Sequence, residues 1–235
     1  MLNSSELERY TRQITLDELG ESGQQRLKDS SVLIVGVGGL GSPIATLLTS
    51  SGFGRIGIVD SDVVSLSNLP RQTLYTTLDI GQPKVECAKR RLSQLNPQVE
   101  IEAYNMRLDI NSAEDIASKY DIIVDACDNI ETRYLMDSVS RKLSLPYIYG
   151  AISGFTGQVS IFNYMGAGSY SQLYPAEATD EMRAPSNSVI ATTPAIIGAI
   201  EANEAIKIAI GYPNTLAGKL LTMDSRQYLF SIFSL

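Results

Sequence analysis

A glycine-rich turn between an apolar run and a helix-forming stretch constrains this chain more than any other feature. The apolar run at residues 32–35 leads into four glycines: Gly36, Gly38, Gly39 and Gly41. Glycines let the backbone turn sharply and approach a phosphate without a Cβ atom, and the following helix points free N–H groups at that phosphate. A second apolar run ends at Asp60, which can accept hydrogen bonds from ribose hydroxyls. The pattern predicts a nucleotide-binding βαβ unit; a turn that needs glycine only for steric reasons is the alternative.

The composition excludes several other classes of protein. A formal charge of −7 over 235 residues lacks the concentrated Lys and Arg of a nucleic-acid-binding surface. The absence of histidine removes Ser-His-Asp and Cys-His catalysis, and the two cysteines, Cys87 and Cys127, are too few for a disulfide framework. No apolar run approaches the length of a membrane span, and the first residues lack the features of a signal peptide. We therefore expect a cytoplasmic protein that binds neither nucleic acid nor a membrane.

Apolar runs alternate with helical patterns over the first 150 residues. We predict strands at 31–37, 55–60, 99–103 and 122–125, and helices at 5–12, 23–27, 40–50, 83–95 and 113–119. This order is typical of a parallel sheet with helices on both faces. Beyond residue 150 the pattern changes to strands at 157–164, 220–223 and 228–233, which we expect to pair antiparallel.

One long helix is predicted among these later strands, opened by Pro194 and closed by Gly211. We expect its buried stripe to consist of isoleucines: Ile196, Ile197, Ile200, Ile206 and Ile210. The predicted fold is thus α/β, a Rossmann-like mixed sheet with a parallel nucleotide-binding half and antiparallel C-terminal strands. We expect a single domain over residues 1–235, with nucleotide binding at 30–150 and substrate binding at 151–235.

Two cations follow the proposed ribose-binding acid. Arg71 lies in the segment at 67–72, and Lys84 opens the helix predicted at 83–95. Two cations beside a glycine turn suit a triphosphate, whose charge exceeds what one helix N-terminus can neutralise. The alternative is that both are ordinary solvated surface charges.

Asp128 lies just beyond the strand predicted at 122–125. In an open α/β sheet the ligand crevice lies outside the carboxyl ends of the strands, so this strand can place Asp128 near the glycine turn. A carboxylate there can hold Mg²⁺ against phosphate oxygens. A second interpretation stays open, in which Asp128 caps the following helix.

Six segments together resemble the MoeB, ThiF and HesA proteins, the bacterial relatives of ubiquitin-activating enzymes. They are RYTRQ at 9–13, GVGGLG at 36–41, DSD at 60–62, SNLPRQ at 67–72, GQPK at 81–84 and DACDN at 125–129. The resemblance extends over almost the whole chain. It implies binding of ATP and Mg²⁺ and adenylation of a C-terminal carboxylate, usually that of a small ubiquitin-like sulfur-carrier protein ending in Gly-Gly.

The resemblance also implies roles for individual residues. Asp60 would hold the ribose, and Asp128 would hold the metal. The phosphates would be bound by three side chains: Asn68, Arg71 and Lys84. Arg12 would reach the phosphates of the other subunit in a homodimer.

The chain departs from the family's pattern at several positions. Where the family commonly has a Cys-x-x-Cys zinc half-site, this chain has Ser169 and Gln172. Pro70 replaces the family's usual glutamine. Some relatives carry a cysteine that forms a covalent link in the loop before the long helix, whereas this chain has Ser186 and Ser188. A serine without a histidine base is a poor nucleophile, so we expect no covalent intermediate there.

Three functions compete at this point. The first is an ATP-dependent adenylyltransferase, in which a carboxylate of a sulfur carrier, a peptide or a small molecule attacks the α-phosphate and pyrophosphate leaves. The second is an NAD-dependent oxidoreductase, which explains the glycine turn and Asp60 but gives no task to the two cations or to Asp128. The third is a noncatalytic protein that only binds a carrier, and the retained set of charged residues argues against it.

The purified protein is predicted to contain no stoichiometric zinc, because it lacks cysteine pairs and has no histidine to replace them. Elemental analysis of the protein, purified without chelators, checks this expectation. A content of one zinc ion per chain would contradict it.

Overall fold

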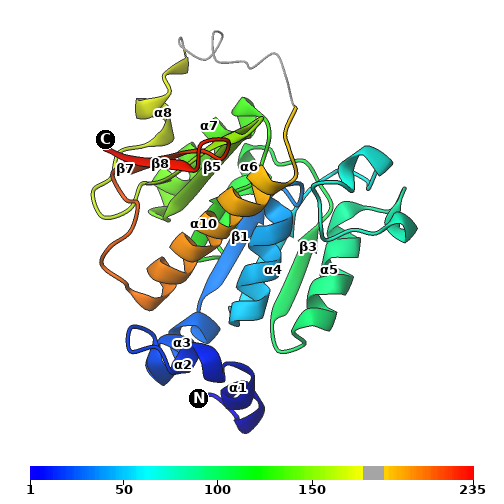
Figure 1. Ribbon diagram of the computed structural model, residues 1–235, viewed down its shortest axis with the longest axis vertical. Helices are drawn as coiled ribbons and strands as arrows, with labels where there is room; N and C mark the ends of the chain where they lie inside the picture. Colours follow the sequence, from blue (N-terminus) through cyan, green and yellow to red (C-terminus); the bar gives the residue numbers. More distant parts are fainter. Residues whose placement is uncertain (177–187) are drawn as a thin grey trace.

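The computed structural model describes residues 1–176 and 188–235, and its centre is an eight-stranded sheet in the order β3-β2-β1-β4-β5-β6-β7-β8 (Figure 1). The strands are β1 (Ser31–Val35), β2 (Arg55–Val59), β3 (Glu100–Tyr104), β4 (Ile122–Asp125), β5 (Tyr147–Ser153), β6 (Thr156–Phe162), β7 (Lys219–Asp224) and β8 (Leu229–Ser234). Strands β1 to β5 pair in parallel, and β6 to β8 continue the sheet antiparallel. The predicted α/β fold with its mixed sheet is confirmed.

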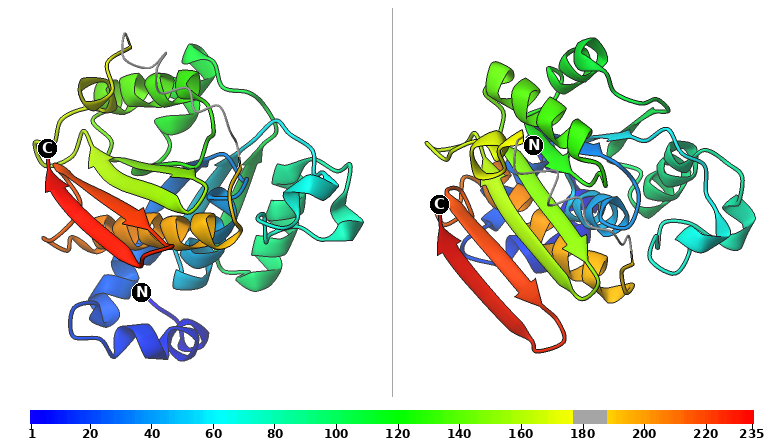
Figure 2. Two further views of the ribbon diagram at one scale, coloured as in Figure 1. Left: turned by 45° about the horizontal axis from the view of Figure 1, so that its top comes forward. Right: turned by 90° about the horizontal axis from the view of Figure 1, so that it is seen from above.

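Helices cover both faces of the sheet (Figure 1, Figure 2). One face carries α3 (Gly20–Asp29), α4 (Gly41–Ser51), α5 (Lys84–Leu95) and α10 (Thr192–Ile210), and the other carries α6 (Ile110–Ala117), α7 (Ile130–Leu143) and α8 (Tyr170–Leu173). Two short helices, α1 (Ser4–Arg9) and α2 (Thr11–Ile14), lie at the end of the sheet where β1 begins. The 3₁₀ turns η1 (Leu66–Asn68) and η2 (Thr77–Asp79) lie in the connection between β2 and α5.

Strand β1 explains why the central strands are almost entirely apolar. Successive side chains of a strand point to opposite faces, so a strand covered by helices on both sides needs apolar residues at every position. Val32 and Ile34 pack into the core beneath α4 and α10, whereas Leu33 and Val35 pack into the core beneath α6 and α7. All four side chains are buried.

The chain order around β1 creates the crevice. From β1 the chain passes through α4 to β2 on one side, and it later returns to β4 on the other side of β1. The connections that leave β1 and β4 therefore diverge at their carboxyl ends, which is where open α/β sheets bind ligands.

Several of the described helices differ from the sequence predictions. The single helix predicted at 5–12 is two helices, α1 and α2, with Tyr10 as the cap between them. The sequence does not predict α7, because its buried face is narrow: Met136 and Val139 are its fully buried apolar residues, and Asp137 and Ser140 are buried beside them.

The predicted stripe of α10 is partly wrong. Ile197 is fully buried, whereas the other four isoleucines are only partly buried. The inner face instead contains Glu201 and Glu204. Apolar residues occur on all sides of this helix, so their spacing does not show which side faces the sheet.

In the described part of the chain, no helix is both long and apolar enough to span a membrane.

Replacing Ile58 with Ala in β2 is predicted to lower the free energy of unfolding by about 2–5 kcal/mol, because it removes a fully buried side chain and leaves a cavity. Urea denaturation measures the change. The matched control is Leu47→Ala on α4, where the side chain is 39% exposed. The control should lose far less stability, and equal losses would contradict the assigned core.

Candidate active site

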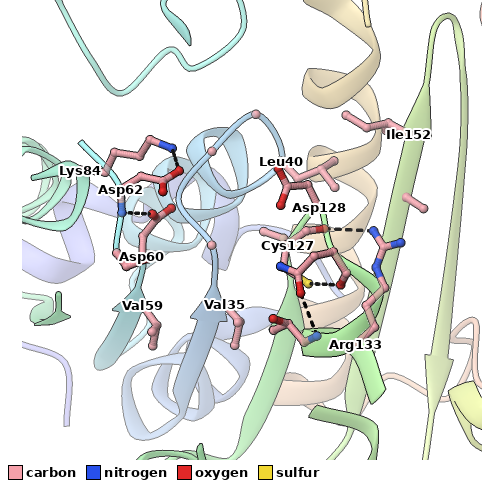
Figure 3. Close-up of a pocket in the computed structure, with 18 of the residues that line it drawn as sticks. Val35, Leu40, Val59, Asp60, Asp62, Lys84, Cys127, Asp128, Arg133 and Ile152 are labelled. Carbon is pink, nitrogen blue, oxygen red and sulfur yellow. Dashed lines mark hydrogen bonds and ion pairs between the residues drawn. The ribbon is translucent and has the colours of Figure 1, made fainter. Parts of the chain in front are cut away.

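A cleft of about 680 Å³ opens at the carboxyl ends of the parallel strands (Figure 3). Its walls come from the glycine turn after β1, the segments after β2 and β4, the first turn of α7 and part of β5. Most of the predicted site residues line it: Gly36, Gly38, Gly39, Asp60, Arg71, Lys84 and Asp128. Residues distant in the sequence thus meet at one place, as the order of the strands requires.

The glycines of the turn are required for different reasons. Gly36 has φ +97°, and a Cβ atom there would lie 2.6 Å from the carbonyl oxygen of Ala126. Gly41 lies outside the cleft lining and packs against the carbonyl of Gly36, so a Cβ atom would collide there as well. In contrast, a Cβ atom at Gly38 or Gly39 would meet no described atom closer than 3.4 Å. Steric need within the protein therefore explains only part of the glycine pattern.

Asp60 connects β2 to the glycine turn. Its Oδ2 accepts a hydrogen bond from the backbone N–H of Val37 at 3.0 Å, and its Oδ1 accepts one from the N–H of Asp62 at 2.9 Å. A carboxylate has about four lone-pair sites, so both oxygens can accept further hydrogen bonds from a ligand. The side chain lies at the cleft wall, as Figure 3 shows.

The two predicted cations are held differently. Lys84 is 5% exposed, and its Nζ pairs with Asp62 at 2.7 Å. Arg71 extends beside Gly39, and its Nη1 donates to the carbonyl oxygen of Ser67 at 3.0 Å. Both side chains line the cleft; Lys84 is buried rather than solvated, whereas Arg71 is partly exposed.

Asp128 is exposed at the cleft, and its carboxylate has no hydrogen-bond partner within the described residues. The N-cap of α7 is Asn129, whose Oδ1 accepts from the backbone N–H of Thr132 at 2.9 Å. The capping interpretation of Asp128 is therefore wrong, because its neighbour performs that task.

Some residues implied by the resemblance lie elsewhere. Asn68 is not among the cleft-lining residues, and its Oδ1 accepts from the N–H of Ser65, the N-cap of η1. Arg12 is exposed on α2, at the end of the sheet opposite the cleft (Figure 1). Ser188 lines the cleft, whereas Ser186 lies outside the described residues.

Sequence reasoning missed Arg133, which lines the cleft from the first turn of α7. Its Nε pairs with Asp125 at 3.1 Å, and its Nη2 donates to the carbonyl oxygens of Cys127 at 3.0 Å and Gly150 at 3.3 Å. Asp125 is 1% exposed, and it also accepts a hydrogen bond from the hydroxyl of Tyr147 at 3.0 Å. The sequence did not indicate a position for Arg133 because its pattern did not predict α7.

A second missed group is Glu201, which is fully buried on α10. Neither of its carboxyl oxygens has a hydrogen-bond partner in the described structure, and the carboxyl group rests against Gly150 of β5. Burial raises the pKa of Glu201 well above its usual range, the charge of Asp125 raises it further, and Arg133 opposes this increase. The raised pKa favours the uncharged form of this carboxyl group.

The described residues contain no group of three or more His, Cys, Asp or Glu side chains that could hold a metal ion. A metal at Asp128 would need most of its ligands from water and from a bound nucleotide. That is the usual coordination of Mg²⁺ at phosphate-binding sites.

The mixed sheet and the cleft at its switch point define a Rossmann-like nucleotide-binding protein. A model of the ThiF family matches residues 10–235, and the chain belongs to this family. The chain is 43% identical over 234 residues to a protein of Thermus thermophilus named sulfur carrier protein adenylyltransferase, covering 96% of this chain and 86% of that protein. The resemblance inferred from the six segments is confirmed.

Other relatives are longer than this chain. A probable molybdopterin-synthase adenylyltransferase of Porphyra purpurea is 41% identical over 98% of this chain, which spans 61% of that protein. The adenylyltransferase and sulfurtransferase MOCS3 of Aedes aegypti is 42% identical over 97% of this chain, which spans 53% of that protein.

Solved structures share the fold. The structure of PaaA superimposes with a TM-score of 0.86 at 27% identity, covering 99% of this chain and 74% of that one. The structure of E. coli MccB with ATP gives a TM-score of 0.85 at 22% identity, covering 99% and 72%.

Replacing Glu201 with Gln is predicted to flatten the pH dependence of stability. A carboxyl whose pKa is raised on folding stabilises fully below its ordinary pKa of 4.5, and this stability is lost as the pH rises toward the folded pKa. A tenfold difference in proton affinity between the folded and unfolded states is worth about 1.4 kcal/mol of stability. Urea denaturation between pH 5 and 8 should therefore show a smaller decrease for the variant. The control Glu8→Gln changes an exposed carboxyl on α1; if both variants keep the wild-type slope, Glu201 is not the titrating group.

Proposed function

We propose that the protein is an ATP-dependent adenylyltransferase that activates a carboxylate. An oxygen of the substrate carboxylate forms a bond to the α-phosphorus of ATP, and the bond to pyrophosphate breaks. The product is an acyl-adenylate, which an external nucleophile then receives. The chain spans less than two thirds of several relatives, so activity, substrate and partners are part of this proposal.

The observation that carries the proposal is the arrangement around Gly38 and Gly39. No described atom lies close enough to require glycine at these two positions. Both glycines nevertheless line the cleft between Asp60 and Asp128. A phosphate that approaches the backbone closely explains why side chains are missing there. Arg71 and Lys84 line the same cleft and can stabilise the charge that develops on the phosphates.

The remaining roles follow from position. Asp60 would hold the ribose, and Asn68 would join the two cations at the phosphates after a change in its present contact. The free, exposed carboxylate of Asp128 fits Mg²⁺, which would neutralise phosphate charge when bound with ATP.

We also propose that the site is completed in a homodimer. Arg12 does not line the cleft of its own chain, and its exposure on α2 leaves it available to the partner's cleft. Residues 30–150 would form the nucleotide-binding part of a single domain, and residues 151–235 would contribute to substrate binding.

The name of the Thermus thermophilus relative supports a sulfur-carrier protein as the substrate, since this chain covers 86% of that protein at 43% identity. The carboxylate would be the C-terminus of a ubiquitin-like carrier that ends in Gly-Gly. Peptide and small-molecule carboxylates are the competing substrates.

Isotope exchange between pyrophosphate and ATP tests the function. Exchange should require Mg²⁺ and a carboxylate substrate, and the panel should include a ubiquitin-like carrier of the same organism, short peptides and amino acids. Calorimetry should show tighter binding of ATP with Mg²⁺ than of NAD. Preference for NAD, or ATP binding without exchange on any carboxylate, would refute the adenylyltransferase.

Replacing Asp128 with Asn is predicted to reduce pyrophosphate exchange by roughly 10²-fold or more, because the amide loses the charge that would hold the metal. The Mg²⁺ concentration for half-maximal exchange should also increase. Asp115→Asn removes an exposed carboxylate on α6, outside the cleft lining, and should leave exchange unchanged. Exchange within twofold of wild type in the Asp128 variant would remove this residue from the metal site.

A further inference from the structure

The order of the strands, together with the proposed roles of Asp60 and Asp128, indicates which side of the cleft the carboxylate substrate would occupy. Asp60 follows β2, the glycine turn follows β1, and Asp128 follows β4. In the proposed function, a nucleotide with its ribose at Asp60 and its α-phosphate at the glycine turn fills the side of β2 and β1, and its metal lies at Asp128. The acyl group would then approach from the side of β5, beyond Asp128.

Arg133 is the cation on that side. Figure 3 shows its side chain rising from α7 between the segment of Cys127 and the strand that contains Ile152. The hydrogen bonds to the carbonyl oxygens of Cys127 and Gly150 hold the guanidinium between these two walls. Its side chain is 14% exposed, and it lines the cleft.

The donors of Arg133 are only partly used. A guanidinium has five N–H groups. The Nε N–H donates to Asp125, and Nη2 donates to the two carbonyl oxygens. Within residues 1–176 and 188–235, neither N–H of Nη1 has an acceptor. Two charge-assisted donors thus remain for a ligand.

The surroundings of Arg133 allow it to receive an anion. The carboxylate of Asp125 pairs with the guanidinium and compensates its charge. The centre of the Tyr149 ring lies 5.2 Å from the guanidinium carbon. The carboxyl group of Glu201 lies behind Gly150, and burial raises its pKa, which favours the form without negative charge on this wall. The guanidinium is therefore held in place before a substrate arrives, which limits the reorganisation needed for binding.

We propose that Arg133 binds the substrate carboxylate through Nη1 and retains the acyl oxygen after adenylation. One carboxylate oxygen forms the bond to the α-phosphorus as pyrophosphate leaves. The other oxygen becomes the carbonyl oxygen of the acyl-adenylate and stays on Nη1. This assignment rests on the proposed adenylyltransferase function and adds the residue that recognises the acyl group.

Binding of two adenosine probes tests the assignment without turnover. The probes are AMP and 5′-O-(N-glycylsulfamoyl)adenosine, a stable mimic of glycyl-adenylate that carries the acyl oxygen. Wild type should bind the mimic more tightly than AMP. Arg133→Gln should lower the affinity for the mimic by about tenfold or more, as expected for lost charge-assisted hydrogen bonds, and should keep the affinity for AMP.

Two further variants keep the test decisive. Arg133→Gln leaves the buried Asp125 without its ion-pair partner, which can destabilise the fold. The double variant D125N/R133Q buries no single charge and should show the same selective loss. Arg107→Gln is the matched control, because Arg107 lines the cleft on the opposite side, after β3; it should keep the wild-type ratio of the two affinities.

The outcomes separate this assignment from the proposed function. If the Arg133 variants keep the preference for the mimic, or if wild type binds the mimic no better than AMP, the assignment is overturned while nucleotide binding stands. If wild type binds neither ATP nor AMP, the proposed function fails, and the assignment fails with it.

Discussion

The close contact between the glycine turn and the segment after β4 determines the geometry of the whole cleft. Gly36 lies so near the carbonyl of Ala126 that no Cβ atom fits between them, and the N–H of Ala126 donates to Val35 at 2.9 Å. Asp60 then fixes the turn from the other side through the N–H of Val37. Three segments that are distant in the sequence are thereby held together by backbone contacts and by the Asp60 side chain on a rigid sheet, which positions the side chains after each strand.

Two buried carboxyl groups, those of Asp125 and Glu201, lie near this wall of the cleft, and their surroundings differ. Asp125 has partners: it forms an ion pair with Arg133 and accepts a hydrogen bond from the hydroxyl of Tyr147, and these contacts offset its desolvation. Glu201 has no such partner in the described structure, and burial instead raises its pKa, which favours the uncharged form. The wall toward β5 therefore contains Arg133, paired with Asp125 and with unused donors, whereas Arg71 and Lys84 line another part of the cleft.

Ser169 and Gln172 stand where the family commonly has two zinc-binding cysteines, and they have a local structural role in this chain. The N–H of Ser169 donates to the side-chain oxygen of Gln172 at 2.8 Å, so these two residues form a cap at the start of α8. The buried carboxylate of Asp137 accepts from the N–H groups of Tyr170 at 3.0 Å and Ser171 at 3.3 Å. Hydrogen bonds to the free amides of the helix thus stabilise this turn.

The sequence by itself determined the parallel half of the sheet, the antiparallel strands after it, and the residues at the carboxyl ends of β1, β2 and β4. Those features depend on local chemistry: apolar strands buried on both faces, glycines in a tight turn, and polar side chains directly after each strand. Only the tertiary structure decided that Asn129 rather than Asp128 caps α7, that Arg133 enters the cleft, and that Glu201 lies in the core. Each of these depends on which face of a helix meets the sheet, and weakly amphipathic helices such as α7 and α10 do not encode that face in the spacing of their apolar residues.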